Sequence, residues 1–389
     1  GTGYTGGAVP LVEDCAVINT EKLDALGSVD RRVLPGLDKA VPVVRAGTGV
    51  VTRRVSDLAV DSGLVFAVDP TSQDASTIGG NVAMNAGGKK AVLWGTTLDN
   101  LVSWRMVDPS GKWMEVHRVG HNLGKIHTQG TVVFDVVDLD DSGRENPGTR
   151  RRIETAGPRL RRQGLGKDVT DKFLEGIPGV QKEGCDGIVT SATFLLHRLP
   201  EHTWTLCLEF FDRDLRVAVP AIVEIRDYLD SMDDVQLAGL EQLDARYIRA
   251  VSYSTKSSRD VSPRMLLIAD IAAPDPQRLE AVAAAVTGMA ASRGGECFIA
   301  RTRAARDRFW APRKRTAAIA AHTNAFKINE DVVIPLERLA DYSEGIERIN
   351  IEYSLRNKIA AVASLRECLV DAGAAGENLL GTLGSDEER

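Results

Sequence analysis

The residues best suited to bind a ligand lie in the stretch DPTSQDASTIGGNVAMNAGG, positions 69–88. Its last ten positions are crowded with residues that disfavour helices and central strands: Gly79, Gly80, Asn81, Asn85, Gly87 and Gly88. Glycine accepts positive φ and lets the backbone approach a ligand closely. Pro70 fixes a turn in which Asp69 and Ser72 bond nearby amides. The stretch predicts a long loop whose free N–H groups suit an anion. A glycine-rich surface loop without a ligand is the alternative.

A second glycine-rich stretch, GTGYTGGAVP, stands at the start of the chain. Gly1, Gly3 and Gly6 fit the G-x-G-x-x-G pattern of nicotinamide dinucleotide sites. That pattern needs a helix directly after it, whereas Pro10 and an extended run over Cys15–Asn19 follow here. The sequence therefore favours a second phosphate-binding loop over the start of a Rossmann fold.

Regular elements must position the first loop. Residues 40–46 (AVPVVRA) predict a strand, and Thr52 predicts the N-terminal cap of a helix that ends at Gly63. This strand–turn–helix unit leads directly into the loop at 69–88.

A hairpin and a polar segment follow the loop. The turn Asp108–Gly111 has Pro at its second position and Gly at its fourth, which predicts a hairpin of strands at 101–107 and 112–117. Residues 118–163 predict a polar insertion with a mobile tip and one β run at 131–137.

Composition limits the class of protein. The 389 residues, 43% of them hydrophobic, suffice for two domains. The net charge of −6 shows no basic excess for nucleic acid. The five cysteines are widely spaced and odd in number, which predicts a reducing compartment. We expect a cytoplasmic location, with a peripheral position on the cytoplasmic side of a membrane left open.

Two further classes of site are disfavoured. No C-x-x-C pair occurs, and His117, His121 and His127 have no common metal-ligand spacing, so no metal is predicted. No apolar run approaches the ~20 residues of a membrane span.

Three motifs occur in a fixed order along the chain, and together they indicate a family. They are GTGYTGGAVP, then DPTSQDASTIGGNVAMNAGGKKAVLWGTTLDNLVSWRMVDPSG, then EGCDGIVTSATFLL. Together they resemble the FAD-binding domain of the PCMH-type flavoproteins, the vanillyl-alcohol-oxidase superfamily. The chain looks most similar to the branch of D-lactate, glycolate and D-2-hydroxyglutarate dehydrogenases. The resemblance covers residues 1–200 well and residues 201 to about 370 more loosely.

The resemblance implies an α+β fold. We expect a two-subdomain PCMH-type FAD-binding domain at 1–200, truncated at its N-terminus and carrying the insertion at about 118–163. A cap domain would follow at 201–389, an antiparallel sheet covered by helices and itself incomplete. The alternation of predicted strands and helices after Pro200 favours the same arrangement.

The resemblance also implies FAD as cofactor and assigns residues to it. We expect the diphosphate to be held by Gly3, Thr5, Gly6, Gly7, Thr77, Gly79, Gly80 and Asn81. We expect the dinucleotide to be lined by Asp69, Pro70, Thr71 and Ser72. Gly184, Gly187, Ile188 and Val189 would lie near the isoalloxazine or the adenine. Trp94-Gly95 stands where the family has Tyr-Gly and keeps an aromatic side chain there.

Fewer residues can be assigned to the substrate than to FAD. Residues 301–335 resemble the family segment that carries a substrate-binding Arg and Lys, at positions matching Arg313 and Lys327. Alternatively, Arg313 is one of several solvated arginines and Lys327 a strand-edge charge. The family's later His-Gly-Asp-Gly-Asn-x-His and Glu-His-Gly stretches, which supply the base and metal ligands, are absent. The catalytic residues are therefore unknown, and we expect a fragment of a longer protein.

Two functions from different classes remain. One is an FAD-dependent oxidoreductase for a 2-hydroxy acid of the D-lactate or glycolate type, with hydride transfer to flavin N5. Its electrons would pass to a quinone, a cytochrome or an iron–sulfur partner. The other is a non-catalytic FAD-binding or electron-transfer subunit.

Overall fold

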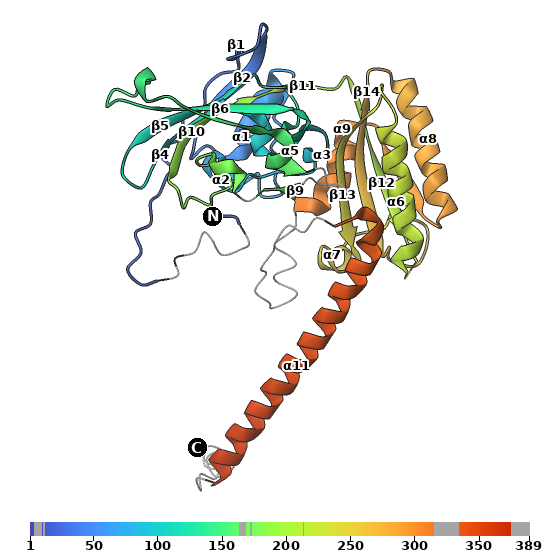
Figure 1. Ribbon diagram of the computed structural model, residues 1–389. Coiled ribbons are helices and arrows are strands. Elements are labelled where there is room, and N and C mark those ends of the chain that lie inside the picture. The colour runs from blue at the N-terminus through green and yellow to red at the C-terminus, as the bar shows by residue number, and fades with distance from the viewer. Residues whose placement is uncertain are drawn as a thin grey trace, which may run out of the picture. The chain divides into compact units, whose positions relative to one another are not determined.

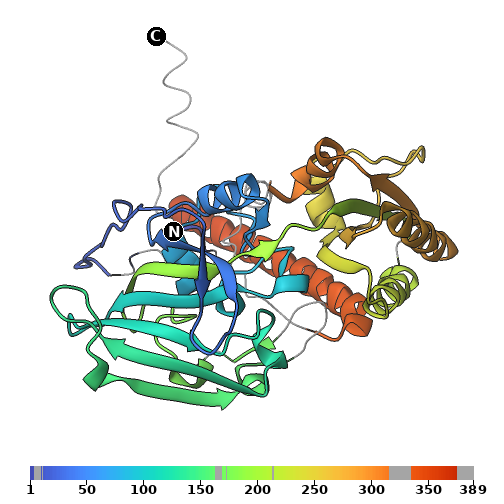
Figure 2. The ribbon, with the colours of Figure 1, turned by 90° about the horizontal axis from the view of Figure 1, so that it is seen from above.

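A computed structural model describes residues 1–3, 10, 12–162, 169–171, 173–212, 214–314 and 334–374. The chain divides into two compact units, Gly1–Leu336 and Glu337–Arg389. The first unit contains both large sheets of the protein (Figures 1 and 2).

The N-terminal part is built on a seven-stranded antiparallel sheet with the order β1-β2-β10-β4-β5-β6-β7. Its strands are β1 (Asp30–Val33), β2 (Ala40–Gly47), β4 (Leu101–Val107), β5 (Trp113–Val119), β6 (Thr131–Asp138), β7 (Arg151–Ala156) and β10 (Ile188–Leu195). Trp104, Phe134 and Phe194 are almost wholly buried in its core. The predicted hairpin is confirmed, because Asp108 accepts from the amides of Ser110 and Lys112.

Short elements connect the strands. They are α1 (Thr52–Asp61), β3 (Leu64–Val65), α2 (Ile78–Ala83), α3 (Ala91–Trp94), α4 (Thr97–Asn100), η1 (Ile126–Thr128), η2 (Pro147–Thr149), α5 (Gly157–Leu160), β8 (Arg161–Arg162), β9 (Val169–Thr170), η3 (Leu174–Gly176) and β11 (His197–Arg198). β3 pairs with β11, and β8 pairs with β9.

The second sheet has four antiparallel strands in the order β13-β14-β12-β15. They are β12 (His202–Phe210), β13 (Gln236–Asp244), β14 (Met265–Ala273) and β15 (Glu296–Ala300). The helices α6 (Leu215–Asp230) and α8 (Pro276–Ser292) contact each other and cover one face (Figure 1). Asp275 caps α8 by accepting from the Gln277 amide at 2.9 Å. This α+β arrangement matches the predicted fold class.

The remaining elements of the first unit are α7 (Ala245–Ala250), α9 (Arg303–Trp310) and η4 (Ala311–Lys314). The helix α11 (Leu339–Ala374) forms the described part of the second unit, and η5 (Leu336–Arg338) precedes it. In the part of the chain that the structure describes, no helix combines the length and the apolarity of a membrane span.

Three local predictions were wrong. Cys15–Asn19 forms no strand. Thr52 is the first helical residue rather than the cap, and its hydroxyl donates to the Ser76 carbonyl at 2.9 Å. The segment 118–163 is not a polar loop with one strand, because it supplies β6 and β7 to the main sheet and buries Phe134 in the core.

Candidate functional site

The two glycine-rich stretches meet in the structure. The Thr2 hydroxyl lies 3.1 Å from the Ser72 hydroxyl, so the start of the chain contacts the loop that begins at Asp69. Gly3, predicted to hold the diphosphate, is exposed beside this contact, whereas Thr5, Gly6 and Gly7 lie outside the described residues.

Residues 78–83 form the short helix α2, although the sequence predicted a loop there. Two polar groups expected to face a ligand are used inside the protein. The Gly79 amide donates to the Thr48 carbonyl at 2.9 Å, and a Cβ on Gly79 would lie 1.6 Å from the Thr48 hydroxyl. Asn81 is buried, and its side-chain amide donates to the Thr52 hydroxyl at 2.8 Å. These two residues therefore shape the loop from behind.

Other predicted donors remain available at the start of α2. Thr77 is the N-terminal cap residue, yet its hydroxyl makes no capping bond. Gly80 is exposed, and among the described residues no backbone acceptor for its amide is found. A Cβ on Gly80 would meet only the Thr77 hydroxyl, at 3.7 Å. Together with the Ser72 hydroxyl, these groups are hydroxyl and amide donors of the kind that bind a diphosphate.

The third motif packs against the end of α2. The Glu183 amide donates to the Ala83 carbonyl at 2.9 Å. Gly184 and Gly187 both have positive φ, of 82° and 144°, and a Cβ on Gly187 would lie 2.3 Å from the Val107 carbonyl oxygen. Ile188 and Val189 start β10, in register with Val107 and Met106 of β4. The structure thus brings this motif next to α2.

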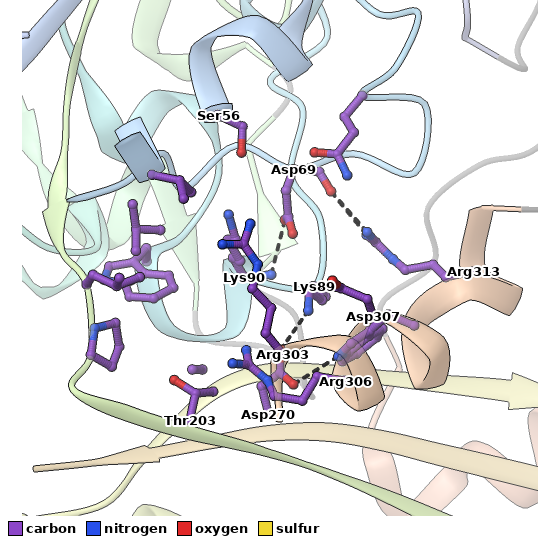
Figure 3. A pocket seen from close by; sticks show the side chains of 18 of the residues that line it. Ser56, Asp69, Lys89, Lys90, Thr203, Asp270, Arg303, Arg306, Asp307 and Arg313 are labelled. Carbon is purple, nitrogen blue, oxygen red and sulfur yellow. Dashed lines mark hydrogen bonds and ion pairs between the residues drawn. The ribbon is translucent and has the colours of Figure 1, made fainter. Parts of the chain in front are cut away.

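A cavity of about 320 Å³ lies where the loop at 69–73 meets the second sheet (Figure 3). Six cationic and three acidic residues line it: Arg53, Lys89, Lys90, Arg303, Arg306, Arg313, Asp69, Asp270 and Asp307. Such an excess of positive charge in a concave site attracts anions. Thr71 and Trp94 also line this cavity.

Asp69 ties the loop to its neighbours. Its carboxylate accepts from the Lys90 amide at 3.2 Å, and its carbonyl accepts from both terminal nitrogens of Arg313. A Cβ on Gly88 would lie 2.1 Å from the Asp69 carbonyl oxygen, so only glycine fits there. The polar atoms of Asp69, which we expected to line the dinucleotide, therefore make contacts within the protein. The Pro70 carbonyl closes the turn by accepting from the Gln73 amide at 3.0 Å.

Arg313 lines the cavity, as expected of a substrate-binding group, but it is not solvated. It lies in η4, is 7% exposed, and forms an ion pair with Glu241 of β13. The Tyr247 hydroxyl fixes this turn by donating to the carbonyls of Pro312 and Arg313 at 3.0 and 3.1 Å. Burial raises the pKa of Glu241, although Arg313 acts in the opposite direction. Lys327 lies outside the described residues.

A second charged pair joins the segment before α3 to β14 of the second sheet. The Lys89 ammonium lies 2.6 Å from the Asp270 carboxylate and 3.8 Å from the centre of the Trp310 ring. Asp270 also accepts from the Trp310 indole at 2.9 Å and from the Thr205 hydroxyl. Burial alone would raise the pKa of Asp270, but Lys89 and these hydrogen bonds outweigh it and lower the pKa.

Trp94 forms an aromatic side of the cavity. Its ring lies 5.6 Å from that of His197, whose Nε2 is 2.6 Å from the Asn100 side-chain oxygen. Burial, together with the nearby Lys90, lowers the pKa of His197 to about 4, so this imidazole is neutral at pH 7. Trp94 thus keeps the aromatic side chain that the sequence predicted.

The sequence alone did not identify Lys89, Lys90, Glu241, Asp270 and Trp310. One signal was visible, because Asp270 is the sole charged residue of the apolar strand MLLIADIAA. Buried acids need partners, so this carboxylate pointed to a cation elsewhere.

Outside the cavity, three side chains lie close enough together to resemble the ligands of a metal site. Glu115, His117 and Glu145 place one ligand atom each within 4.8 Å of one another. Arg105 lies 2.6 Å from Glu115, and His117 lies 2.7 Å from Glu145. These protein partners explain the cluster.

Comparisons with known proteins agree with the fold and the loops. Residues 1–117 match the family described as FAD binding domain, and residues 200–364 match the C-terminal domain of FAD linked oxidases. Glycolate oxidase subunit GlcD of Escherichia coli (strain K12) is 25% identical over 360 residues, 92% of this chain and 59% of that protein. D-lactate dehydrogenase of Archaeoglobus fulgidus is 37% identical over 116 residues, 30% of this chain and 24% of that protein.

A solved structure of alkyldihydroxyacetonephosphate synthase has a TM-score of 0.50 and 18% identity, covering 80% of this chain and 51% of that chain, and shows the fold alone. The chain spans 59% of the length of the glycolate oxidase subunit that it matches. The two matched domains lead to one conclusion. The chain carries the FAD binding domain and the C-terminal domain of the FAD-linked oxidases, and its cofactor is FAD.

Proposed function

We propose that the chain belongs to an FAD-dependent oxidoreductase that oxidises a 2-hydroxy acid of the D-lactate or glycolate type. The observation that supports this most is the cationic cavity, which lies against the loop at 69–73 and contains Arg313. The similarity to glycolate oxidase subunit GlcD and to D-lactate dehydrogenase supports the substrate class.

In this proposal, the loops hold FAD through hydroxyls and amides. Ser72, Thr77 and Gly80 present donors to the diphosphate, together with Gly3, Thr5, Gly6 and Gly7. Asp69, Pro70, Thr71, Gly79 and Asn81 shape the loop, while Gly184, Gly187, Ile188 and Val189 contact the far part of the dinucleotide. Bound FAD supplies a hydride acceptor at flavin N5.

The substrate would enter the cavity with its carboxylate toward Arg313. A guanidinium grips a carboxylate through two parallel hydrogen bonds. Lys327 is proposed as a second cation for the same substrate. The surrounding Lys90, Arg303 and Arg306 raise the local concentration of anions.

We place the boundary between the FAD-binding and cap domains near residue 200. The strands of the seven-stranded sheet end at Leu195, and those of the four-stranded sheet begin at His202. Electrons would leave to a quinone, a cytochrome or an iron–sulfur partner, and a cytoplasmic location is proposed with them.

Anaerobic titration of the FAD-loaded protein with D-lactate or glycolate tests the proposal. We expect the flavin absorbance to bleach, and Arg313→Ala to require more substrate while keeping its FAD content. Arg278→Ala is the matched control, because Arg278 forms an exposed pair with Asp234 away from the cavity. An FAD-loaded protein that no 2-hydroxy acid bleaches would favour the alternative, a non-catalytic FAD-binding or electron-transfer subunit.

A further inference from the structure

Arg313 has both of its carboxylate-binding edges occupied. A guanidinium grips a carboxylate either along the edge formed by Nε and one Nη or along the edge formed by both Nη atoms. The Asp69 carbonyl accepts from Nη1 and Nη2, each at 3.2 Å. The Glu241 carboxylate forms an ion pair with Nε. An incoming carboxylate therefore binds in the bidentate manner only if one of these partners leaves.

The two partners differ in how firmly they are held. Asp69 contributes a main-chain carbonyl, and its residue is 3% exposed, packed over Gly88 and bonded to the Lys90 amide. Moving this carbonyl would disturb the loop proposed to hold FAD. Glu241 contributes a flexible side chain that is 28% exposed. Rotation about its side-chain bonds frees the Nε edge without moving the backbone.

The position of Glu241 suits such an exchange. β13 is an edge strand of the four-stranded sheet, and the amide of the adjacent Leu240 donates to the Lys89 carbonyl at 3.3 Å. Arg313 and Lys89 attract the Glu241 carboxylate, while Asp69 repels it. Burial disfavours the ionised form, so the pKa of Glu241 is raised. The carboxylate is therefore held mainly by Arg313, and it is poorly solvated where it lies.

We propose that Glu241 is the resident carboxylate of Arg313 in the ligand-free protein and that a substrate carboxylate binds by displacing it. The inference rests on the proposed function, because it assumes that Arg313 receives the substrate. It makes Glu241 a determinant of carboxylate affinity. The exchange breaks no covalent bond, since one carboxylate replaces another on the same guanidinium.

Calorimetric titration of the FAD-loaded protein with oxalate, a carboxylate without a hydroxyl to oxidise, tests the displacement. Glu241→Gln keeps the shape but removes the competing charge, and we expect it to tighten oxalate binding about tenfold. Glu241→Asp keeps the charge on a shorter side chain and should fall between the two. Glu280→Gln is the matched control, because it removes the charge from an exposed pair with Arg301 that does not line the cavity.

The outcomes separate this inference from the proposed function. Equal oxalate affinity in the wild type, Glu241→Gln and Glu241→Asp would overturn it, as would oxalate binding that survives Arg313→Ala. Tighter oxalate binding by Glu241→Gln without bleaching by any 2-hydroxy acid would uphold the role of Glu241 and reject the proposed substrate class. Bleaching by glycolate with no effect of Glu241→Gln would do the reverse. A melting curve and the FAD content establish that each variant is folded.

Discussion

Two groups of buried charges in this chain use the same chemical pair, a guanidinium and a carboxylate, in different surroundings. In the N-terminal part, Asp99 and Arg161 form an ion pair in which both side chains are 0% exposed. Asp99 also accepts from the amides of Thr96 and Ile126, at 2.6 and 2.7 Å. Arg118 is equally buried and donates to the Asp99 carbonyl at 3.2 Å. This pair closes the turns around α4 and is not part of the wall of the cavity that Arg313 lines.

In the pair between Arg313 and Glu241, the guanidinium lies in the wall of a cavity instead. The Glu241 side chain is 28% exposed, and the second partner of the guanidinium is a carbonyl from the loop at 69–73. The contrast shows that burial alone does not identify a functional charge. A carboxylate that several backbone amides hold keeps the local structure in place, whereas we propose that one held mainly by the guanidinium of a cavity residue yields to a ligand.

The largest loss of stability is expected from Asp99→Asn. The change leaves the buried guanidinium of Arg161 without the carboxylate of Asp99, and removing one partner of a buried pair costs about 3–5 kcal/mol. We expect the free energy of unfolding, measured with urea, to fall by that amount. Asp234→Asn breaks only the exposed pair with Arg278, and its free energy of unfolding should equal that of the wild type. An Asp99→Asn protein of undiminished stability would contradict the structural role given to this pair.

An intermediate loss of stability is expected from Lys89→Met, which removes the cationic partner of Asp270. The lowered pKa of Asp270 means that its ion pair stabilises the fold above the ordinary pKa, about 3.9, and that this contribution is lost as the pH falls through the lowered value. Without Lys89, burial raises the pKa of Asp270, so its ionised form opposes folding at neutral pH.

The loss of stability in Lys89→Met should therefore be about 1–3 kcal/mol near pH 7 and should shrink toward pH 4. Urea unfolding at both pH values measures it. A loss that is the same at the two pH values would show that Lys89 acts through packing on Trp310 rather than through its charge.

The smallest effect on stability is expected from Glu241→Gln. Because burial raises the pKa of Glu241, folding favours its protonated form, and a neutral glutamine imitates that form. We expect the free energy of unfolding near pH 7 to change by less than about 1 kcal/mol. Thermal unfolding of this variant beside Asp99→Asn gives the sharpest contrast. A loss as large as that of Asp99→Asn would erase the distinction between the two pairs.

The sequence predicted the turn that begins at Asp69, because turn signals are local. Glycine and proline restrict the chain at their own positions, so the stretch at 69–88 was recognisable without knowledge of its neighbours. Thr77 and Gly80 present available donors at the start of α2, where the sequence expected them.

The direction of each side chain was not predictable in the same way. Asn81 has the right type for a ligand donor, but residues 78–83 form a helix that turns it toward Thr52. Burial of Ile78 and Val82 against the sheet outweighs the low helix propensity of the glycines.

The partners of the cavity charges are set by tertiary contacts. Glu241 and Asp270 lie on neighbouring strands far from Lys89 and Arg313 in the sequence, and β-pairing brings them together. No local pattern encodes such pairs. The polar run around residues 140–150 concealed the strand β7, because only Ile153 and Ala156 of its six residues are apolar.

Fluorescence titration of the apoprotein with FAD tests the central claim most directly, namely that the loops around Ser72, Thr77 and Gly80 hold the diphosphate. We expect saturable binding of one FAD per chain. Combining Ser72→Ala with Thr77→Val should weaken this binding at least about tenfold without changing the circular dichroism spectrum. A folded wild type that takes up no FAD, or a double variant that binds FAD as tightly as the wild type, would contradict the account.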